Sequence, residues 1–376
     1  MSQKLLSICI PTCNRADYLK RLLDNLMSQV IKFRDNIEIC ISNNGSSDNT
    51  KEVVATFEEK YFDLIKYSEN EKNLGFDINV LKVVGMAEGE FVWSISDDDL
   101  IVENGFKQVI NFLIKNKDKK MGGMVVKFNS YGTDPKTGKQ IKYQSFVNKN
   151  KPETYGGLSF VEMLRDNIPY QGLSVLIFNN SLLKKILIEK KDLAEKGIGT
   201  GQFHSWLFFL LFILNKEARC HVLNKAIVVS LSKTRYPMKK YINLICCWKI
   251  KFFDSLLSVI DKSEKDIIEA VKNMRGNPSL SIIYIVALYK AFGMVNFASY
   301  VECMKLSFKY LFFVKAFFVS VCLAIILMTP SNIVEKICKL SLKFRFKTRE
   351  ERESNWLETC IVFSSWRKIS ATQEAK

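Results

Sequence analysis

The chain has 376 residues, enough for two domains or for one domain with a large appendage. Hydrophobic residues make up 48% of it, which is ample for a core, but 55 Lys and Arg against 39 Asp and Glu leave a net charge of +16. This excess indicates an anionic partner, such as nucleic acid, an anionic membrane surface or a phosphorylated substrate. With two histidines and no CxxC pair, a Cys/His zinc site is not expected. Cysteines within apolar runs and the lack of a signal-peptide pattern predict a reducing, cytoplasmic setting.

Strands and helices are expected to alternate through the first hundred residues. Short apolar runs without internal Gly or Pro are typical of buried strands, and between them apolar residues recur at helical spacing, as in Leu19, Leu22 and Leu26. This β-α-β-α-β-α-β order predicts parallel strands joined by right-handed crossovers. The strands are expected at residues 5–10, 37–41, 64–67 and 91–96.

Polar loops follow three of these strands, at residues 11–15, 42–48 and 97–99. Ligands bind at the carboxyl ends of the strands in open α/β sheets, so we expect the three loops to converge on one crevice. The last loop, Asp97-Asp98-Asp99, needs a positive partner because adjacent carboxylates repel each other. Mg²⁺ or Mn²⁺, bound together with a substrate diphosphate, is such a partner. The alternative is a solvated acidic turn before a helix that begins near Val102.

The chain is expected to divide near residue 235. Residues 1–235 form the α/β part, with a nucleotide-binding half at 1–115 and an acceptor half at 116–235. The acceptor half is expected to hold a further helix at 203–214. Its remaining elements are expected as strands at 124–128, 172–178 and 221–231, a helix at 158–164 and an exposed hairpin or loop at 130–152.

Residues 236–376 are expected to be helical and basic. Residues 305–347 hold eight basic residues and one acidic residue, Glu335. The apolar run 311–328 is broken by Lys315 and reaches only the lower length limit for spanning a bilayer. We therefore favour helices that lie on an anionic membrane surface over a transmembrane span or a purely soluble helical subdomain.

Four ordered motifs resemble those of family 2 glycosyltransferases of the GT-A fold, in particular bacterial abequosyltransferase-like and related O-antigen sugar transferases. The match is close over residues 5–115 and loose over 150–230. The resemblance implies the Rossmann-like, mostly parallel sheet of nucleotide-diphospho-sugar transferases, a divalent metal (Mn²⁺ or Mg²⁺) and inversion at the anomeric carbon. The motifs are ICIPTCNR at 8–15, ISNNGSSD at 41–48, NLGFDIN at 73–79 and GEFVWSISDDD at 89–99.

The resemblance also implies roles for single residues. Asn43 and Asn44 stand where the family usually has an acidic pair that touches the base, and amides donate as well as accept hydrogen bonds, which leaves the nucleotide open. Asp99 would coordinate the metal directly and Asp97 would share it. The residues that would bind the nucleotide sugar are Pro11, Thr12, Asn14, Arg15, Asn43, Asn44, Asn73, Gly75, Asn79, Asp97 and Asp98.

The catalytic base of the family usually lies at the start of a helix after the acceptor-side strand, often as an acidic residue. The corresponding region, 197–206, contains no Asp or Glu, and its one titratable base is His204. A histidine is suited to taking a proton from a hydroxyl near neutral pH. The alternative is a histidine that packs against or caps the helix, in which case Asp192 and Glu195 are the next candidates.

Together these features predict an inverting glycosyltransferase at the cytoplasmic face of the bacterial inner membrane, as a peripheral protein. It would move a sugar from a nucleotide-diphosphate donor to a lipid-linked oligosaccharide or another glycan acceptor in the synthesis of O-antigen or capsule. Two rivals are a basic nucleic-acid-binding or membrane-binding protein and a non-catalytic relative. No nucleic-acid-binding motif is present, and the three aspartates argue for catalysis.

Overall fold

The computed structural model describes residues 4–116, 120–133, 140–145, 147–165, 172–200, 202–231, 247–275 and 313–345, and also residues 283, 286, 287, 290, 301, 304 and 305. The chain forms two compact units. The first comprises residues 1–129, 145–231 and 254–274, and the second comprises 130–144, 232–253 and 275–376. The boundary expected near residue 235 falls outside the described residues and stays a prediction.

One mixed sheet of ten strands organises the α/β part, in the order β3-β2-β1-β4-β9-β6-β10-β5, with β7 beside β6 and β8 beside β10. The strands are β1 (Leu6–Thr12), β2 (Ile37–Asn43), β3 (Ile65–Glu69), β4 (Phe91–Ser94), β5 (Asp99–Ile101), β6 (Met121–Thr133), β7 (Gln140–Ser145), β8 (Thr154–Leu158), β9 (Leu176–Asn179) and β10 (Arg219–Leu231).

The first four strands form the parallel half of this sheet. β1 pairs in parallel with both β2 and β4, and β2 pairs in parallel with β3, which confirms the predicted parallel order. Every residue of β1, β2 and β4 is buried, as expected for strands covered on both faces. β9 runs antiparallel to β4 and begins the mixed half, in which β10 runs antiparallel to β5 and β8.

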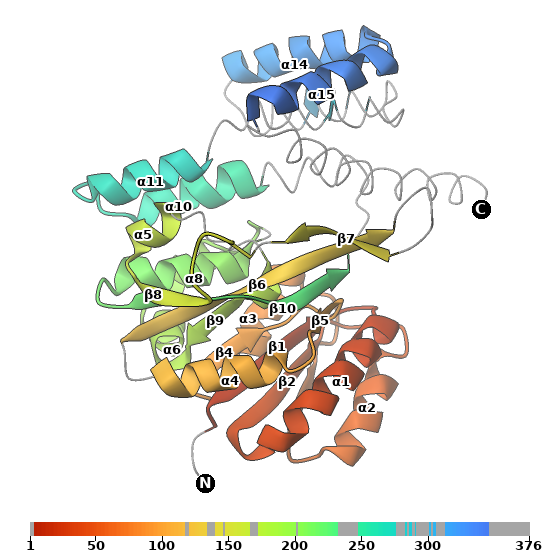
Figure 1. Cartoon of the computed structure of the whole chain (residues 1–376), viewed down its shortest axis with the longest axis vertical. Helices are drawn as coiled ribbons and strands as arrows, with labels where there is room; N and C mark the ends of the chain where they lie inside the picture. The colour runs from red at the N-terminus through yellow and green to blue at the C-terminus, as the bar shows by residue number, and fades with distance from the viewer. Residues whose placement is uncertain are drawn as a thin grey trace. The chain divides into compact units, whose positions relative to one another are not determined.

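Helices cover both faces of the sheet (Figure 1). The chain steps across the sheet in one direction from β1 to β3, so right-handed crossovers put α1 and α2 on the same face, where α4 joins them. The return step from β3 to β4 puts α3 on the opposite face, with α6 and α8. These helices are α1 (Ala16–Val30), α2 (Thr50–Lys60), α3 (Phe76–Gly85), α4 (Gly105–Asn116), α6 (Asn180–Glu189) and α8 (Phe203–Leu214).

Shorter helices join these elements, and further helices follow β10. The short ones are η1 (Ile31–Asn36), α5 (Phe160–Arg165), η2 (Leu173–Val175) and α7 (Lys191–Glu195). After β10 come a π-helical turn, η3 (Cys247–Phe252), then α10 (Phe253–Val259), α11 (Lys265–Arg275), α14 (Phe313–Met328) and α15 (Ser331–Arg345). Within the described part of the chain, no helix combines the length and the apolar character that crossing a membrane requires.

Aromatic side chains fill the core on both faces of β4. Trp93 stacks on Phe106 of α4, with ring centroids 6.5 Å apart. On the other face, Phe178 of β9 packs edge-on against Phe208 of α8 at 5.4 Å. Because β4 ends within this fixed core, the aspartates that follow it emerge from a rigid strand.

Three local predictions were wrong. Asp99 is not part of a turn but begins β5, because Asp99–Ile101 pairs with Val228–Ser230 of β10, and α4 consequently begins at Gly105 instead of near Val102. The helix expected at 158–164 is present as α5 but begins at Phe160, because Leu158 ends strand β8, which pairs with β10. Neither pairing is visible from local propensity, since each joins segments more than 60 residues apart.

Candidate functional site

The loops after β1, β2 and β4 meet at one edge of the sheet, as predicted. The amide of Asn44 donates to the carbonyl of Thr12 at 2.9 Å, and the amide of Ile95 donates to the carbonyl of Cys9 at 2.9 Å. A fourth segment joins them, because the amide of Asn70 donates to the carbonyl of Asn43 at 2.8 Å. The carboxyl ends of these strands therefore form a continuous polar edge.

Asn14 fastens the first loop to the second. It adopts a left-handed backbone conformation, with φ of 54°, which asparagine tolerates better than most residues. Its side-chain oxygen accepts from the amide of Ser47 at 2.7 Å. The amide of Ala16 at the start of α1 donates to Asp48 Oδ2 of the second loop at 2.9 Å. Asn14 thus shapes the loop from within.

The remaining asparagines expected to bind nucleotide form a network that is buried except at the exposed Asn73. Asn44 donates to Asn73 Oδ1 at 3.0 Å and accepts from the amide of Leu74 at 3.0 Å. Asn79 accepts from the hydroxyl of Ser42 at 2.7 Å. Asn43, Asn44 and Asn79 are each at most 3% exposed, so they hold the edge in shape.

Gly75 follows this network with a φ of 89°, a conformation that L side chains rarely adopt. Open space surrounds its Cα on the side where a side chain would stand. Pro11 lies inside β1 opposite Ser42 and is buried, so it fixes the strand end.

Asp97 is the most enclosed of the three consecutive carboxylates, at 4% exposed. The Thr12 hydroxyl donates to its Oδ2 at 2.8 Å, and Arg15 Nε lies 3.0 Å from its Oδ1. Burial raises the pKa of Asp97 to about 6, although the Arg15 charge and the Thr12 hydrogen bond oppose the shift. Both carboxylate oxygens therefore face partners from the first loop.

Two arginines hold Asp98: Arg15, which precedes α1, and Arg21, which lies within it. Its Oδ2 accepts from an Arg15 guanidinium nitrogen at 2.6 Å, and its Oδ1 accepts from the Ser96 hydroxyl at 2.6 Å. Arg21 donates to its main-chain carbonyl at 3.0 Å. Both guanidinium groups lie over the Tyr18 ring, with their central carbons 4.5 and 5.4 Å from its centroid.

Asp99 turns to the opposite half of the sheet. Its Oδ2 accepts from the hydroxyl of Ser174 in η2 at 2.6 Å. The same hydroxyl accepts from the amide of Ser96 at 2.9 Å, so Ser174 joins both ends of the acidic loop. Burial and the neighbouring Asp98 charge raise the pKa of Asp99 to about 7. The Asp99 carboxyl therefore changes charge near neutral pH.

His204 is the second residue of α8 and is 3% exposed. The loop that leads into α8 reaches the polar edge, because the amide of Gly199 donates to Asp77 Oδ2 at 2.7 Å. Asp77 lies in the first turn of α3, two residues after Gly75. The burial of His204 favours the packing interpretation, and its role as base stays a prediction, as do the alternatives Asp192 and Glu195, which are exposed on α7.

Sequence reasoning missed several residues that build this site. Ser174 was assigned only to a strand, and its contact with Asp99 spans 75 positions, beyond any local signal. Asp77 lies within a matched motif but was not singled out. The spacing of Arg15, Tyr18 and Arg21 at three-residue steps on one helix was the available signal for their stacking.

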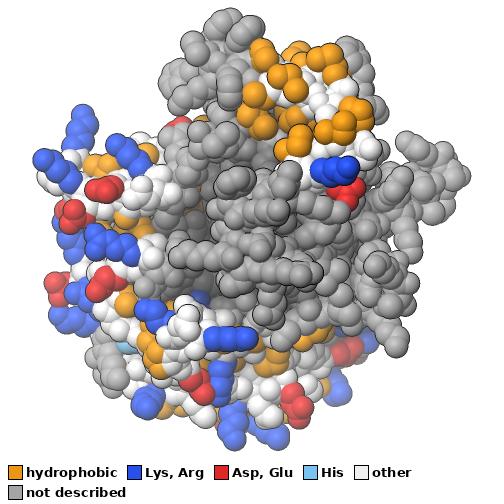
Figure 2. Space-filling model, turned by 45° about the horizontal axis from the view of Figure 1, so that its top comes forward, with side chains coloured by type: hydrophobic (Ala, Val, Ile, Leu, Met, Phe, Trp, Pro, Cys, Tyr) orange, Lys and Arg blue, Asp and Glu red, His pale blue; other side chains and the backbone are white. Residues whose placement is uncertain are grey.

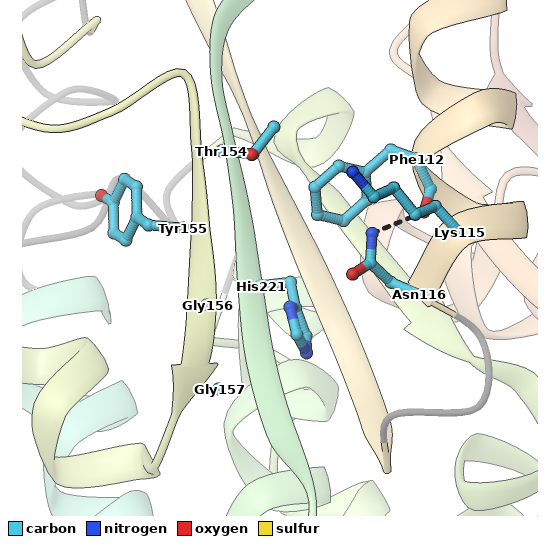
Figure 3. A pocket seen from close by; sticks show the side chains of 8 residues that line it. All are labelled: Phe112, Lys115, Asn116, Thr154, Tyr155, Gly156, Gly157 and His221. Atoms are coloured by element: carbon cyan, nitrogen blue, oxygen red, sulfur yellow. Dashed lines mark hydrogen bonds between the residues drawn. The ribbon is translucent and has the colours of Figure 1, made fainter.

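A separate cavity of about 460 Å³ lies away from the aspartates (Figure 3). On β10, Ser230 pairs with Asp99, whereas His221 lines the cavity. The two residues are nine positions apart along the strand, or about 30 Å. No carboxylate lines it, so it does not resemble a metal site. Its lining residues are Phe112, Lys115, Asn116, Thr154, Tyr155, Gly156, Gly157 and His221.

Comparisons with known proteins agree with this architecture. Residues 7–187 match the family model described as glycosyl transferase family 2. Residues 7–187 are a glycosyltransferase family 2 domain. An abequosyltransferase of Salmonella typhimurium, RfbV, is 39% identical over 114 residues, or 30% of this chain and 34% of that protein. The chain thus matches about a third of the length of this relative.

Two longer matches extend beyond the family 2 domain. A GalNAc(5)-diNAcBac-PP-undecaprenol β-1,3-glucosyltransferase of Campylobacter jejuni is 24% identical over 339 residues, covering 89% of this chain and 97% of that protein. The crystal structure of Staphylococcus aureus TarS 1-349 superposes with a TM-score of 0.52 at 18% identity, covering 92% of this chain and 93% of that chain. The structural match concerns the fold alone. A mixed sheet with helices on both faces is consistent with the GT-A fold.

The acidic loop of the family 2 domain suits a divalent cation that is shared with a substrate. Asp97 and Asp99 point to different segments, and among the described residues no three His, Cys, Asp or Glu side chains gather into a metal-binding group. A cage made only of protein ligands is therefore not formed there. Mg²⁺ and Mn²⁺ commonly take one or two carboxylates and complete their coordination with substrate phosphates and water, and the carboxylates of the acidic loop fit that pattern.

The raised pKa values of Asp97 and Asp99 predict an unusual dependence of stability on pH. Between about pH 4, where aspartates of the unfolded chain ionise, and pH 7, the folded state retains protons that the unfolded state has lost. This contribution to the free energy of unfolding is therefore greatest at low pH and falls as the pH rises to 7. Asp99→Asn removes the free-energy cost of ionising Asp99 in the folded state. It should therefore raise the melting temperature of the metal-free protein at pH 8 but not at pH 4.

Asp63→Asn is the matched control for this measurement. Asp63 is exposed and its pKa is held below the usual range by a hydrogen bond from Arg34, so its contribution has the opposite sign and is lost on acidification. Asp63→Asn should not stabilise the protein at pH 8. Equal destabilisation by Asp99→Asn at both pH values would contradict the burial argument.

Proposed function

We propose that the chain is a metal-dependent, inverting glycosyltransferase that takes its sugar from a nucleoside-diphosphate donor. The observation that carries this proposal is the acidic loop Asp97–Asp99 at the carboxyl edge of the parallel strands in a family 2 domain. Ligands bind at this edge in open α/β sheets. We propose a matching domain organisation. Residues 1–115 would bind the donor, residues 116–235 would bind the acceptor, and residues 236–376 would form the basic helical region.

The donor would lie across the edge formed by the first two loops and the 70–75 segment. Thr12, Asn14 and Arg15 would line the ribose and diphosphate side. The buried asparagine network would support Asn73 and Gly75, which lie at its outer end. Asn43 and Asn44 are bound to their own chain by their side-chain amides, so they would select the base by shaping the loop that contacts it.

Asp99 would hold a Mn²⁺ or Mg²⁺ ion, with Asp97 and Asp98 in support. A bound divalent ion stabilises the negative charge that develops on a departing diphosphate. Ser174 orients the Asp99 carboxylate from the opposite half of the sheet. The Asp99 pKa near 7 means that this carboxylate is available as a ligand above neutral pH.

His204 would take the proton of the acceptor hydroxyl. Its helix α8 follows the loop that binds Asp77 at the start of α3, which supports a position beside the sugar. The acceptor would be a lipid-linked oligosaccharide or another glycan. The Campylobacter relative, whose name specifies an undecaprenol-linked substrate, aligns over 89% of this chain and supports that class of acceptor.

The basic C-terminal region would hold the enzyme on the cytoplasmic face of the inner membrane. α14 and α15 expose an apolar stripe, which we define as Val321, Ile325, Met328, Ile333 and Ile337, each at least 43% exposed. Figure 2 shows hydrophobic side chains gathered on this face. α14 also buries Val319 and Leu323, so it is apolar on both sides, which is typical of a helix with an apolar partner. An anionic lipid surface would be this partner, because the sequence around the stripe is basic.

Donor binding tests the central proposal. The melting temperature should be measured with UDP, GDP, CDP and dTDP and with their sugars, each with Mn²⁺ and with EDTA. One nucleotide should stabilise the protein only with Mn²⁺, by about 2.7 kcal/mol at a concentration a hundred times its dissociation constant. Asp99→Asn should lose this stabilisation, whereas Asp63→Asn should keep it. Metal-independent binding to Asp99→Asn would make the metal assignment wrong.

The role of His204 is tested by turnover. His204→Ala should lower turnover at least about a hundredfold, the usual scale of general-base catalysis, without changing donor affinity. His221→Ala is the matched control, because it removes the other buried histidine, at the far cavity. If His204→Ala turns over like His221→Ala, His204 is eliminated and Asp192 and Glu195 are the next candidates.

Membrane association is tested by flotation with vesicles. The protein should float with phosphatidylglycerol vesicles, should not float with phosphatidylcholine alone, and should be partly released by high salt. Ile325→Asp with Met328→Asp should abolish flotation, because a charge in the stripe is costly to bury. Phe62→Asp is the control, since Phe62 is 80% exposed but lies outside the stripe. An unaffected double variant would contradict the assignment of this surface.

A further inference from the structure

Arg15 lies between the first two carboxylates of the acidic loop, Asp97 and Asp98, and the solvent. It precedes α1, and its guanidinium bridges Asp97 Oδ1 and Asp98 Oδ2 at 3.0 and 2.6 Å. The Arg15 side chain is 29% exposed, whereas those of Asp97 and Asp98 are 5% and 16% exposed. The guanidinium is thus the solvent-facing side of this ion pair.

The carboxylate oxygens of Asp97 and Asp98 divide into two kinds. Two of them accept from neutral hydroxyls of the chain, Asp97 Oδ2 from Thr12 and Asp98 Oδ1 from Ser96. The other two face the positive charge of Arg15. A cation that approaches this pair of carboxylates from solvent therefore meets oxygens that are already neutralised.

The structure also provides a position that Arg15 can keep after it releases the carboxylates. Its central carbon lies 4.5 Å from the centroid of the Tyr18 ring, one helical turn away, and the ring face attracts a cation. Arg21 also lies over Tyr18 and is bound to the main chain of Asp98, so the ring is held in place. A short movement of Arg15 over this ring would uncover Asp98 without unfolding α1.

We propose that Arg15 is a stand-in cation, which neutralises Asp97 and Asp98 until a divalent metal displaces it. The inference rests on the proposed metal dependence of the same site and adds a competition between two cations. Because the metal must first displace a paired guanidinium, its affinity for the protein alone is reduced. Metal binding then depends on the additional ligands that a donor diphosphate supplies, so that the metal and the donor bind together.

The test is the affinity for Mn²⁺ alone, measured by electron paramagnetic resonance of the free ion in the absence of nucleotide. Arg15→Gln should bind Mn²⁺ at least about fivefold more tightly than the wild type, the lower end of usual coupling between two ligands. In EDTA the same variant should melt at a lower temperature, because Asp97 loses its charged partner, and Mn²⁺ should raise its melting temperature more than that of the wild type.

Lys20→Gln is the matched control. It removes one positive charge from the same helix, but Lys20 is paired with the exposed Asp24, so its Mn²⁺ affinity should change by less than about twofold. Arg15→Lys keeps the charge without the fork that bridges two carboxylates, and it should lie between the wild type and Arg15→Gln. It also serves as the test if Arg15→Gln does not fold.

The outcomes separate this inference from the proposed function. Tighter Mn²⁺ binding by the Arg15 variants supports the inference even if no sugar transfer is found. Unchanged or weaker Mn²⁺ binding, together with a lower melting temperature, would identify Arg15 as a purely structural partner and overturn it. Absence of Mn²⁺ binding by the wild type and by all Arg15 variants would overturn it as well, whatever the enzyme transfers.

Discussion

Three adjacent carboxylates at the end of a buried strand are the constraint on which the site depends. Asp97 and Asp98 share Arg15, which precedes α1, while Thr12 of the first loop binds Asp97 and Ser174 of η2 binds Asp99. Each contact joins parts of the chain at least 75 residues apart. The electrostatic cost of the acidic loop is thereby reduced by contacts that also fix the two halves of the sheet against each other.

The asparagine network supplies hydrogen-bond partners to buried main-chain groups without adding charge. The loops after β1 and β2 expose main-chain groups that the sheet no longer pairs, and buried groups of this kind need partners. Amide side chains both donate and accept, so Asn44 can satisfy a carbonyl and an amide of the 70–75 segment at once. A carboxylate at that position could not donate, and it would add a fourth negative charge to an edge already crowded with three.

Local patterns were sufficient for the parallel half of the sheet but not for the mixed half. The period of apolar residues located α1, and turn residues located the loops, because these signals lie within one element. β5 and β8 exist through pairing with β10, which no local window contains. The same limit applies to the site: the motifs identified Arg15 and Asp97–Asp99, whereas the orienting contact from Ser174 depends on the folded sheet.

The two edges of the parallel strands treat buried carboxylates in opposite ways. At the amino edge, Glu38 is 4% exposed, yet Lys66, Ser7 and the amide of Glu88 hold its pKa below the ordinary value. At the carboxyl edge, the effect of burial outweighs that of the hydrogen bonds and the Arg15 charge, and the pKa values of Asp97 and Asp99 rise to about 6 and 7. Glu38 therefore stabilises the fold at neutral pH, whereas the aspartates weaken it there. A protein retains destabilising carboxylates where their charge serves binding, which is the strongest physical argument that this edge is the site.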